Sequence, residues 1–169
     1  MKNIVIVLIS LVCLIVIPSC KKGDNDPFIS LRSRDARITG KWKVVKFEEI
    51  DNNNGSIYTS ILNGSILTET SNGSSSSYSY SFNWEILADG TYKYTRITDG
   101  ELSSGSYSWH WVDDTQKKTK IILYGGGLFV VDRLTNNDLV LKYEYGDTDL
   151  SNGSNDVDSY SLTITLEKE

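Results

Sequence analysis

Hydrophobic and polar side chains alternate along most of the chain after residue 40. In residues 78–86, apolar and aromatic side chains occupy every second position, and Ser, Asn and Glu fill the positions between them. Successive side chains of a β-strand point to opposite faces, so this period predicts a strand that is buried on one face. The same period predicts strands in residues 107–111, 139–145 and 160–166. No segment of this region keeps a helical period for three turns, so the sequence predicts an all-β fold.

Turn residues separate the predicted strands. They are Asp89-Gly90, Asp99-Gly100, Asp113-Asp114, Gly125-Gly126-Gly127 and Asn136-Asn137-Asp138. Connections this short favour hairpins between neighbouring strands. A meander of such strands hides both its edges if it closes on itself, which predicts a single antiparallel up-and-down β-barrel of about eight strands over residues 38–169. A β-sandwich shows the same alternation and is the alternative.

The tripeptide Asn-Gly-Ser begins at residues 54, 63 and 72. A calcium-binding solenoid with a nonapeptide repeat would need Asp residues and paired glycines, which this repeat lacks. The repeat therefore predicts either short strands punctuated by Asn-Gly turns or a flap. In a barrel, a segment near the first hairpin would lie over one mouth.

The first 19 residues form a unit of their own. Lys2 is followed by an apolar run over residues 4–17, interrupted only by Ser10, and then by Pro18, Ser19 and Cys20. The run has about fourteen residues, fewer than the roughly 20 that a helix needs to cross a bilayer. A basic start, an apolar run and a small-residue cleavage site predict a signal peptide over residues 1–19. Residues 20–37 are charged and predict a flexible tether.

Residues 17–20, Ile-Pro-Ser-Cys, resemble the lipobox of bacterial lipoproteins. The resemblance implies that the signal peptide is removed before Cys20 and that Cys20 is lipidated and holds the chain to a membrane. Two lysines and then acidic residues follow in residues 21–26. This tail resembles that of Bacteroidetes lipoproteins displayed on the outer face of the outer membrane, with the periplasmic face as the alternative. Removal of Cys13 with the signal peptide leaves Cys20 without a disulfide partner or a thiol metal site.

The charge of the chain excludes one class of partner. It has 17 Lys and Arg against 22 Asp and Glu, a net charge of −5, which becomes more negative when Lys2 is removed. An acidic chain without a basic stripe argues against nucleic-acid binding.

Residues 39–45, Thr-Gly-Lys-Trp-Lys-Val-Val, resemble the Gly-x-Trp start of the first strand in lipocalin-type barrels. Looser matches at residues 88–92, 105–109 and 134–139 resemble landmarks of the lipocalin-like lipoproteins of Bacteroidetes. Together they cover residues 27 to about 167.

The resemblance implies roles for residues at one end of the barrel. Gly40 and Trp42 would close its narrow end, after a short turn at residues 33–38. Lipocalins also carry an Arg near the last strand that stacks on this Trp. The chain has no Arg at that place, so Arg37 or Arg133 would have to reach Trp42.

Candidate catalytic residues are sparse. The single His, His110, lies between Trp109 and Trp111, and alternation points it away from their face, with no partner for a general base supplied by the sequence. Five glutamates lie on predicted strands, most of them on the polar face, which predicts a solvated barrel exterior. They are Glu48, Glu49, Glu85, Glu101 and Glu144. The sequence predicts neither an enzyme nor a cofactor.

The segment from Asp147 to Asp158 places oxygen-bearing side chains at alternate positions, as calcium loops do. The glycine that makes the sharp turn, Gly153, comes one position late, and no predicted helix flanks the segment. An acidic hairpin loop without a metal is the prediction, and calcium binding is the alternative.

Aromatic residues are the remaining signal, since the chain has 10 Tyr and 4 Trp, many of them on predicted inner faces. They either fill the barrel as core or line a partly polar cavity. The lining hypothesis selects Tyr80, Trp84, Tyr94, Trp109 and Tyr143. The first functional hypothesis is a lipid-anchored barrel that binds a small, partly apolar molecule without catalysis. The second is a protein-interaction or structural module of the cell envelope, such as an accessory subunit or an inhibitor, with a filled barrel.

Overall fold

The computed structural model describes residues 32–53, 56–112, 118–124, 127–147 and 158–169. The predicted signal peptide and most of the predicted tether lie outside these ranges. The elements are α2 (Arg34–Ile38), β1 (Gly40–Asn53), β2 (Ser56–Asn63), β3 (Ile66–Ser71), β4 (Ser74–Ile86), β5 (Thr91–Thr98), β6 (Glu101–Trp111), β7 (Lys120–Leu123), β8 (Gly127–Leu134), β9 (Asp138–Asp147) and β10 (Asp158–Lys168). In the described ranges, no helix has the length and hydropathy to cross a bilayer.

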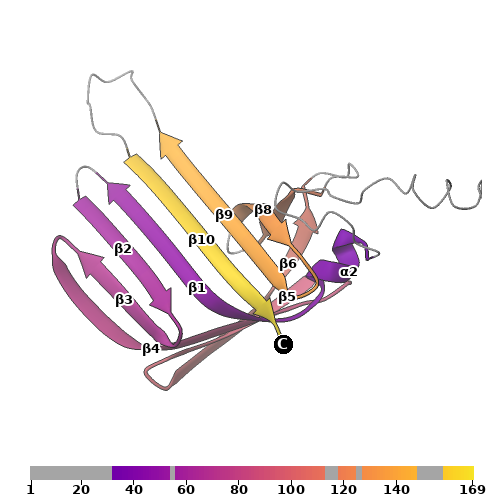
Figure 1. Ribbon diagram of the computed structural model, residues 1–169, viewed down its shortest axis with the longest axis horizontal. Helices are drawn as coiled ribbons and strands as arrows, with labels where there is room; N and C mark the ends of the chain where they lie inside the picture. The colour runs from indigo at the N-terminus through magenta and orange to yellow at the C-terminus, as the bar shows by residue number, and fades with distance from the viewer. Residues whose placement is uncertain (1–31, 54–55, 113–117, 125–126, 148–157) are drawn as a thin grey trace, which may run out of the picture.

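Within the described ranges, ten antiparallel strands form one sheet that closes into a ring. Each strand pairs with the next along the chain, and β10 returns to pair with β1 (Figure 1). The predicted all-β fold with up-and-down strand order is confirmed. The strand number differs from the expected eight because the segment with the Asn-Gly-Ser repeat forms two strands of its own.

The ring has different numbers of strands at its two ends. At the start of β1, Trp42 pairs directly with Trp84 of β4. From Lys46 onward β1 pairs instead with β2, so the β2–β3 hairpin is inserted between β1 and β4. We call the end with α2 the narrow end, where the ring consists of β1 and β4 to β10. The opposite end, where β2 and β3 join the ring, is the wide end (Figure 1).

The turn of the inserted hairpin and the turn after it match the predicted Asn-Gly turns. Gly64 has a φ of 66°, and Asn72 and Gly73 have φ values of 49° and 83°. These left-handed conformations are open to Gly and Asn at little cost, as in tight hairpin turns. The first copy of the repeat, which begins at residue 54, lies partly outside the described residues.

A bulge changes which residues of β1 face inward. Trp42 and Val44 are buried, and the register with β10 then shifts between Val44 and Lys46. An extra residue in one strand reverses the parity of the alternation beyond it. After the bulge, Phe47 and Glu49 therefore share the inner face.

The hydrophobic core is densest at the narrow end, where α2 covers the ring. Ile38, Trp42 and Leu134 are fully buried there. The guanidinium of Arg37 donates to the carbonyl of Leu134, and the side chain of Arg37 is buried. The helix begins at Arg34, inside the predicted tether, so the folded part of the chain starts before residue 38.

Candidate functional site

Polar side chains form a row across the inner face of the wide end. Glu49 of β1 pairs with Ser60 of β2, which pairs with Glu69 of β3. Residues opposite each other in antiparallel strands point to the same face, so the three side chains lie next to one another. Ser60 is 2% exposed, whereas both glutamates are half-buried. The sheet therefore places Glu49 and Glu69 on the same face as the partly buried Phe47. Asp51, which lies opposite Tyr58 and Tyr160, shares this face and is also half-buried.

Tyrosines lie close to these two carboxylates. Glu69 raises the pKa of Tyr58 of β2 and of Tyr78 of β4, and Glu49 raises the pKa of Tyr160 of β10. The strands that carry these tyrosines surround β1 and β3, because β10 and β2 flank β1 and β4 flanks β3. Tyrosines from three different strands thus lie near the two carboxylates.

Burial keeps these tyrosines protonated. It raises the pKa of Tyr58 to about 12, with the nearby carboxylate of Glu69 as the second cause. Burial likewise raises the pKa of Tyr78 and of Tyr160, and the nearby carboxylates of Glu69 and Glu49 add to it. A phenolate beside a carboxylate would be repelled, so each phenol remains a neutral hydrogen-bond donor.

Tyr80 extends the site along β4 and brings in a basic residue. Burial raises the pKa of Tyr80, and the positive charge of nearby Arg96 partly opposes this. Glu69 and Glu49 raise it further through their charges, which places the hydroxyl of Tyr80 within electrostatic reach of both. Four tyrosines therefore converge on the Glu49–Glu69 pair.

A series of aromatic rings leads from this polar group towards the core. Along β4, the ring centroids of Tyr80 and Phe82 lie 6.2 Å apart and those of Phe82 and Trp84 lie 5.6 Å apart, both edge to face. On the other side of the ring, Tyr143 meets Tyr160 with centroids 5.4 Å apart. These separations are in the range at which aromatic pairs attract each other.

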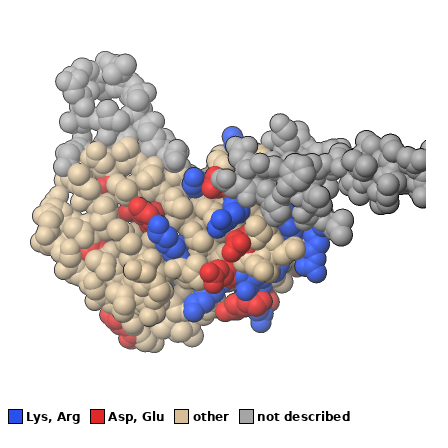
Figure 2. All heavy atoms as spheres, viewed as in Figure 1, with Lys and Arg blue, Asp and Glu red and all other residues tan. Residues whose placement is uncertain are grey.

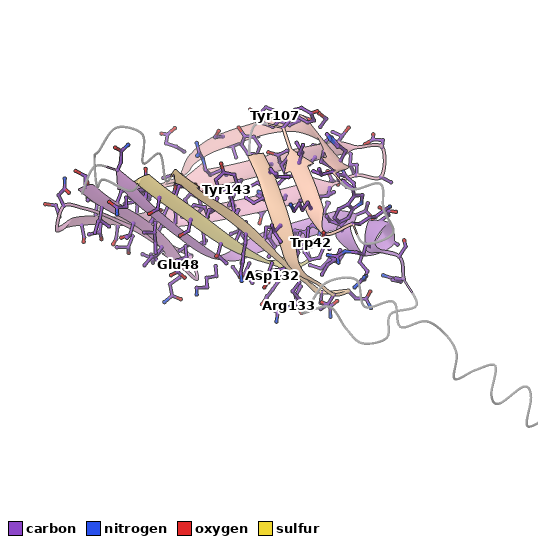
Figure 3. The ribbon with its side chains drawn as sticks, turned by 90° about the horizontal axis from the view of Figure 1, so that it is seen from above. Trp42, Glu48, Tyr107, Asp132, Arg133 and Tyr143 are labelled. Carbon is purple, nitrogen blue, oxygen red and sulfur yellow. The ribbon has the colours of Figure 1, made fainter. Side chains whose placement is uncertain are left out.

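The structure separates the five predicted lining residues into two groups. Trp84 and Trp109 are 5% and 7% exposed and belong to the core. Tyr80, Tyr94 and Tyr143 are half-buried on the inner face, and Figure 3 shows Tyr143 pointing between the two layers of strands.

The two buried tryptophans differ in their indole N–H groups. The Nε1 of Trp109 donates to the carbonyl of Leu87 at 2.8 Å. The Nε1 of Trp84 is buried and has no hydrogen-bond partner among the described residues. A buried N–H group without an acceptor is costly, and native proteins rarely keep one.

The narrow end is closed by Trp42 together with a residue that the sequence analysis missed. Trp42 donates from Nε1 to the carbonyl of Ile38 at 2.7 Å, and the ammonium of Lys168 lies 5.0 Å from the centre of its ring. The cation over the Trp42 ring is therefore Lys168. The guanidinium of Arg37 donates to the carbonyl of Leu134, and Figure 3 shows Arg133 on the outer side, away from Trp42. The last strand does supply the cation, but as a Lys.

Most of the five glutamates were expected on the barrel exterior, and Glu49 is an exception to this pattern. Glu48 and Glu85 do point outward, paired with Lys46 at 3.2 Å and Lys93 at 3.9 Å. Glu49 faces inward because the β-bulge precedes it. Glu101 starts β6 opposite Thr98 and is exposed, and the side chain of Glu144 lies outside the described residues.

His110 is exposed, as alternation predicts, and its ring lies 5.5 Å from that of Tyr124. In the described ranges, no three His, Cys, Asp or Glu side chains are grouped so that they could hold a metal ion. The predicted acidic loop between Asp147 and Asp158 lies outside the described residues.

Sequence reasoning missed Glu69, Arg96 and Tyr58 as parts of the site. The alternation of Tyr58, Ser60 and Leu62 was a signal that one face of this segment is inward. This alternation was hard to recognise because several inner positions of β2 and β3 are polar, so the segment looks like a solvent-exposed repeat.

Known proteins add no further constraint. A scan against models of protein families, a search of curated proteins and a search of solved structures each gave no match to this chain.

Proposed function

We propose that this protein is a lipid-anchored lipoprotein of the bacterial outer membrane that binds a small, partly apolar molecule in the wide end of a lipocalin-like barrel, without catalysis. The observation that carries the proposal is the inner face of the wide end, which is aromatic and polar and only half-buried. Ligand sites combine an apolar lining with a few placed polar groups in this way.

Three features of the fold support the lipocalin-like part of the proposal. The strands follow an up-and-down order, a short helix covers the narrow end, and Trp42 is packed between that helix and Lys168. The inserted β2–β3 hairpin is a departure, and it enlarges the end at which a ligand would enter. The anchor at Cys20 follows from the lipobox resemblance alone.

Binding without catalysis fits the placement of titratable groups. His110 is on the outer face, and the inner carboxylates of Glu49 and Glu69 lie beside tyrosines whose pKa values are raised. These phenols hold their protons at neutral pH, so they orient a bound molecule rather than exchange protons with it.

Native mass spectrometry of the chain purified from the membrane fraction of its host tests the proposal. The wild type and the outer-face variant Tyr124→Ala should retain a small-molecule adduct that Tyr80→Ala and Tyr143→Ala lose. Absence of the adduct from the wild type, or its presence in all variants, contradicts the proposal. Cys20→Ser should leave the membrane fraction, which checks the anchor.

A protein-interaction module is the second candidate, favoured by exposed isoleucines on the outer face of β1 to β3. Ile50, Ile57, Ile61 and Ile66 are 40%, 55%, 42% and 48% exposed. A hollow of about 290 Å³ lies beside Ile57, between Thr59 and Thr70. In the view of Figure 2, charged side chains gather in the half with α2, and the half with β2 and β3 is largely uncharged. Binding of an envelope protein that Ile57→Lys abolishes would support this candidate.

A further inference from the structure

An apolar surface covers the outer side of the wide end. Glu48 points outward (Figure 3) and pairs with Ile61 of β2, so Ile61 also lies on the outer side. By the same register Ile50 pairs with Thr59 on this side. The isoleucines of this surface are 40%, 55%, 42% and 48% exposed, and they are Ile50, Ile57, Ile61 and Ile66. We call these four residues, with the Thr and Ser side chains between them, the isoleucine face.

Polar side chains of the isoleucine face bond to one another. The hydroxyls of Thr68 and Ser77 lie 2.9 Å apart, and those of Thr70 and Ser75 lie 2.8 Å apart. Both threonines are on the face, because they pair with outer residues of β2. A hydroxyl that already has a hydrogen-bond partner loses less on leaving water than one without a partner. The face can therefore be removed from water at a low polar cost.

The isoleucine face is also electrically neutral. At its margin Lys46 and Glu48 pair with each other at 3.2 Å. β2 contains no charged residue, and the one charged residue of β3, Glu69, points inward. In the view of Figure 2, charged side chains gather instead in the half with α2. A chain with a net charge of −5 thus presents one neutral, apolar side.

The composition of this face fits a lipid surface better than a protein partner. Protein interfaces concentrate their binding energy in Trp, Tyr and Arg side chains, and the isoleucine face consists of Ile, Thr and Ser. Attachment to a lipid surface needs no such anchor residues, because it scales with the apolar area that is buried. Isoleucine is also among the side chains that enter a bilayer most readily.

The sequence before the described residues brings the face within reach of a membrane. Residues 20–32, from the proposed anchor to the first described residue, span at most about 40 Å. Along β1, residues 40–50 lead from the end with α2 to the isoleucine face over about 33 Å. A domain tethered this closely meets the membrane at a high effective concentration, so a modest apolar area is enough to hold it there.

We propose that the isoleucine face lies against the lipid bilayer that anchors the chain, so that the domain rests on its side on the membrane. The inference rests on the proposed function, because it requires the anchor at Cys20. It adds a second membrane contact and an orientation, in which the wide end opens along the membrane surface rather than away from it.

A fluorescent dye at a single thiol tests the inference. Lipidation uses the thiol of Cys20, and Cys13 is removed with the signal peptide, so Ile61→Cys supplies the one free thiol of the mature chain. The full lipidated chain is labelled there with a nitrobenzoxadiazole dye and reconstituted in vesicles of phosphatidylethanolamine and phosphatidylglycerol. We expect its emission to shift to shorter wavelength and to be quenched when nitroxide-labelled lipids are included, because the dye lies at the lipid boundary.

Val130→Cys is the matched control. Val130 is 45% exposed on the outer side of β8, where it lies between Lys120 and Lys142. It is therefore as exposed as Ile61 but surrounded by charge and outside the isoleucine face. A dye at this position should show neither the shift nor the quenching.

A second variant tests whether the isoleucines cause the contact. Ile57→Thr combined with Ile66→Thr removes apolar surface and keeps the β-branched shape that strands favour, so the fold is retained. Melting temperatures check that the chain is folded. The loss of two half-exposed Ile side chains should weaken the contact about tenfold, and most of the quenching at the labelled position 61 should disappear.

The outcomes separate the inference from the anchor. Equal quenching at positions 61 and 130, or none at position 61 while the chain stays with the vesicles, would overturn the inference, leave the anchor in place and favour a protein partner for the face. A shift at position 61 that appears without nitroxide quenching and grows with the number of chains per vesicle would assign the face to a second copy instead. Loss of the chain from the vesicles would overturn the anchor and the inference together.

Discussion

Gly40, at the start of the first strand, is constrained by its own backbone conformation and by a side chain of the last strand. Its φ is 131°, and a Cβ atom added to it would lie 2.7 Å from Cε of Lys168. Lys168 is fixed there because its ammonium donates to the carbonyls of Arg37 at 2.9 Å and Thr39 at 2.7 Å, and it lies over Trp42. This position of the Gly-x-Trp pattern therefore requires glycine for two reasons. Its backbone has a positive φ, and the Lys168 side chain occupies the space that a Cβ atom would need.

We expect Gly40→Ala to lower the free energy of unfolding by about 2 to 4 kcal/mol, from backbone strain and overpacking together. Gly100→Ala is the control. Gly100 also has a positive φ, of 88°, but an added Cβ meets nothing within 4 Å, so only the strain of about 1 to 2 kcal/mol applies. Urea denaturation measures both. Equal losses in the two variants would mean that Lys168 does not press on this position.

At the scale of elements, α2 is a helix of five residues that cannot persist by itself. Asp35 attaches it to β6, since the carboxylate accepts from Nε1 of Trp111 at 2.6 Å and also pairs with Lys118. Arg34 lies over the ring of Trp111, with its guanidinium carbon 5.8 Å from the ring centre. The helix exists because the ring holds it.

Asp35→Ala should lower the free energy of unfolding by about 1 to 2 kcal/mol, the usual cost of removing a hydrogen bond to a charged group. Lys118→Ala removes only the partly exposed ion pair and should cost less than about 1 kcal/mol. Thermal unfolding followed by tryptophan fluorescence measures both, and Glu167→Ala, an exposed change on β10, serves as the reference. A larger loss for Lys118→Ala than for Asp35→Ala would show that the ion pair, not the indole bond, holds α2.

At the scale of the whole molecule, the polar interior makes stability depend on alkaline pH. Burial is the first cause of the raised pKa values of tyrosines on β2, β4, β5 and β10, and it brings both Tyr58 and Tyr92 to about 12. Lys168 acts in the opposite sense, because burial lowers its pKa. Several tyrosines with raised pKa values outweigh this one lysine, so the tyrosines determine how the free energy of unfolding changes with pH.

The free energy of unfolding should fall as the pH rises from about 10 to about 12. Below about 10 both states keep the phenol protons, and within this window the unfolded chain loses protons that the folded chain retains, which favours unfolding. Urea denaturation at several pH values measures the fall, and absorbance at 295 nm follows phenolate formation. Glu69→Gln should reduce the fall in the free energy of unfolding only in part, because burial is the larger cause of the raised pKa of Tyr58. Complete ionisation of a still-folded chain near pH 10 would refute the prediction.

Much of the fold could be predicted from alternation alone. Residues 78–86 lie within β4, and residues 107–111, 139–145 and 160–166 lie within β6, β9 and β10. The Asn-Gly and Asp-Gly turns fall where the strands end, because their left-handed conformations depend only on local residues. The aromatic side of β4 is also inward, as its period predicts.

The parts of the site that could not be predicted depend on contacts between distant segments. The bulge after Val44 turns Glu49 inward, and the pairing of β1, β2 and β3 then places it in one row with Glu69. Lys168 reaches Trp42 only because β10 closes the ring against β1. Each of these contacts joins segments that are far apart in the sequence, so no local sequence pattern indicates it.

The sequence by itself determined the strand faces, the turns and the lipobox-like start, because each depends on neighbouring residues. Only the tertiary structure decided that the ring has more strands at one end than at the other, that the carboxylates of Glu49, Asp51 and Glu69 face its inside, and that a lysine closes it. The physical reason is that register and closure are properties of pairs of strands, and a one-residue bulge in one of them reverses the faces of all that follows.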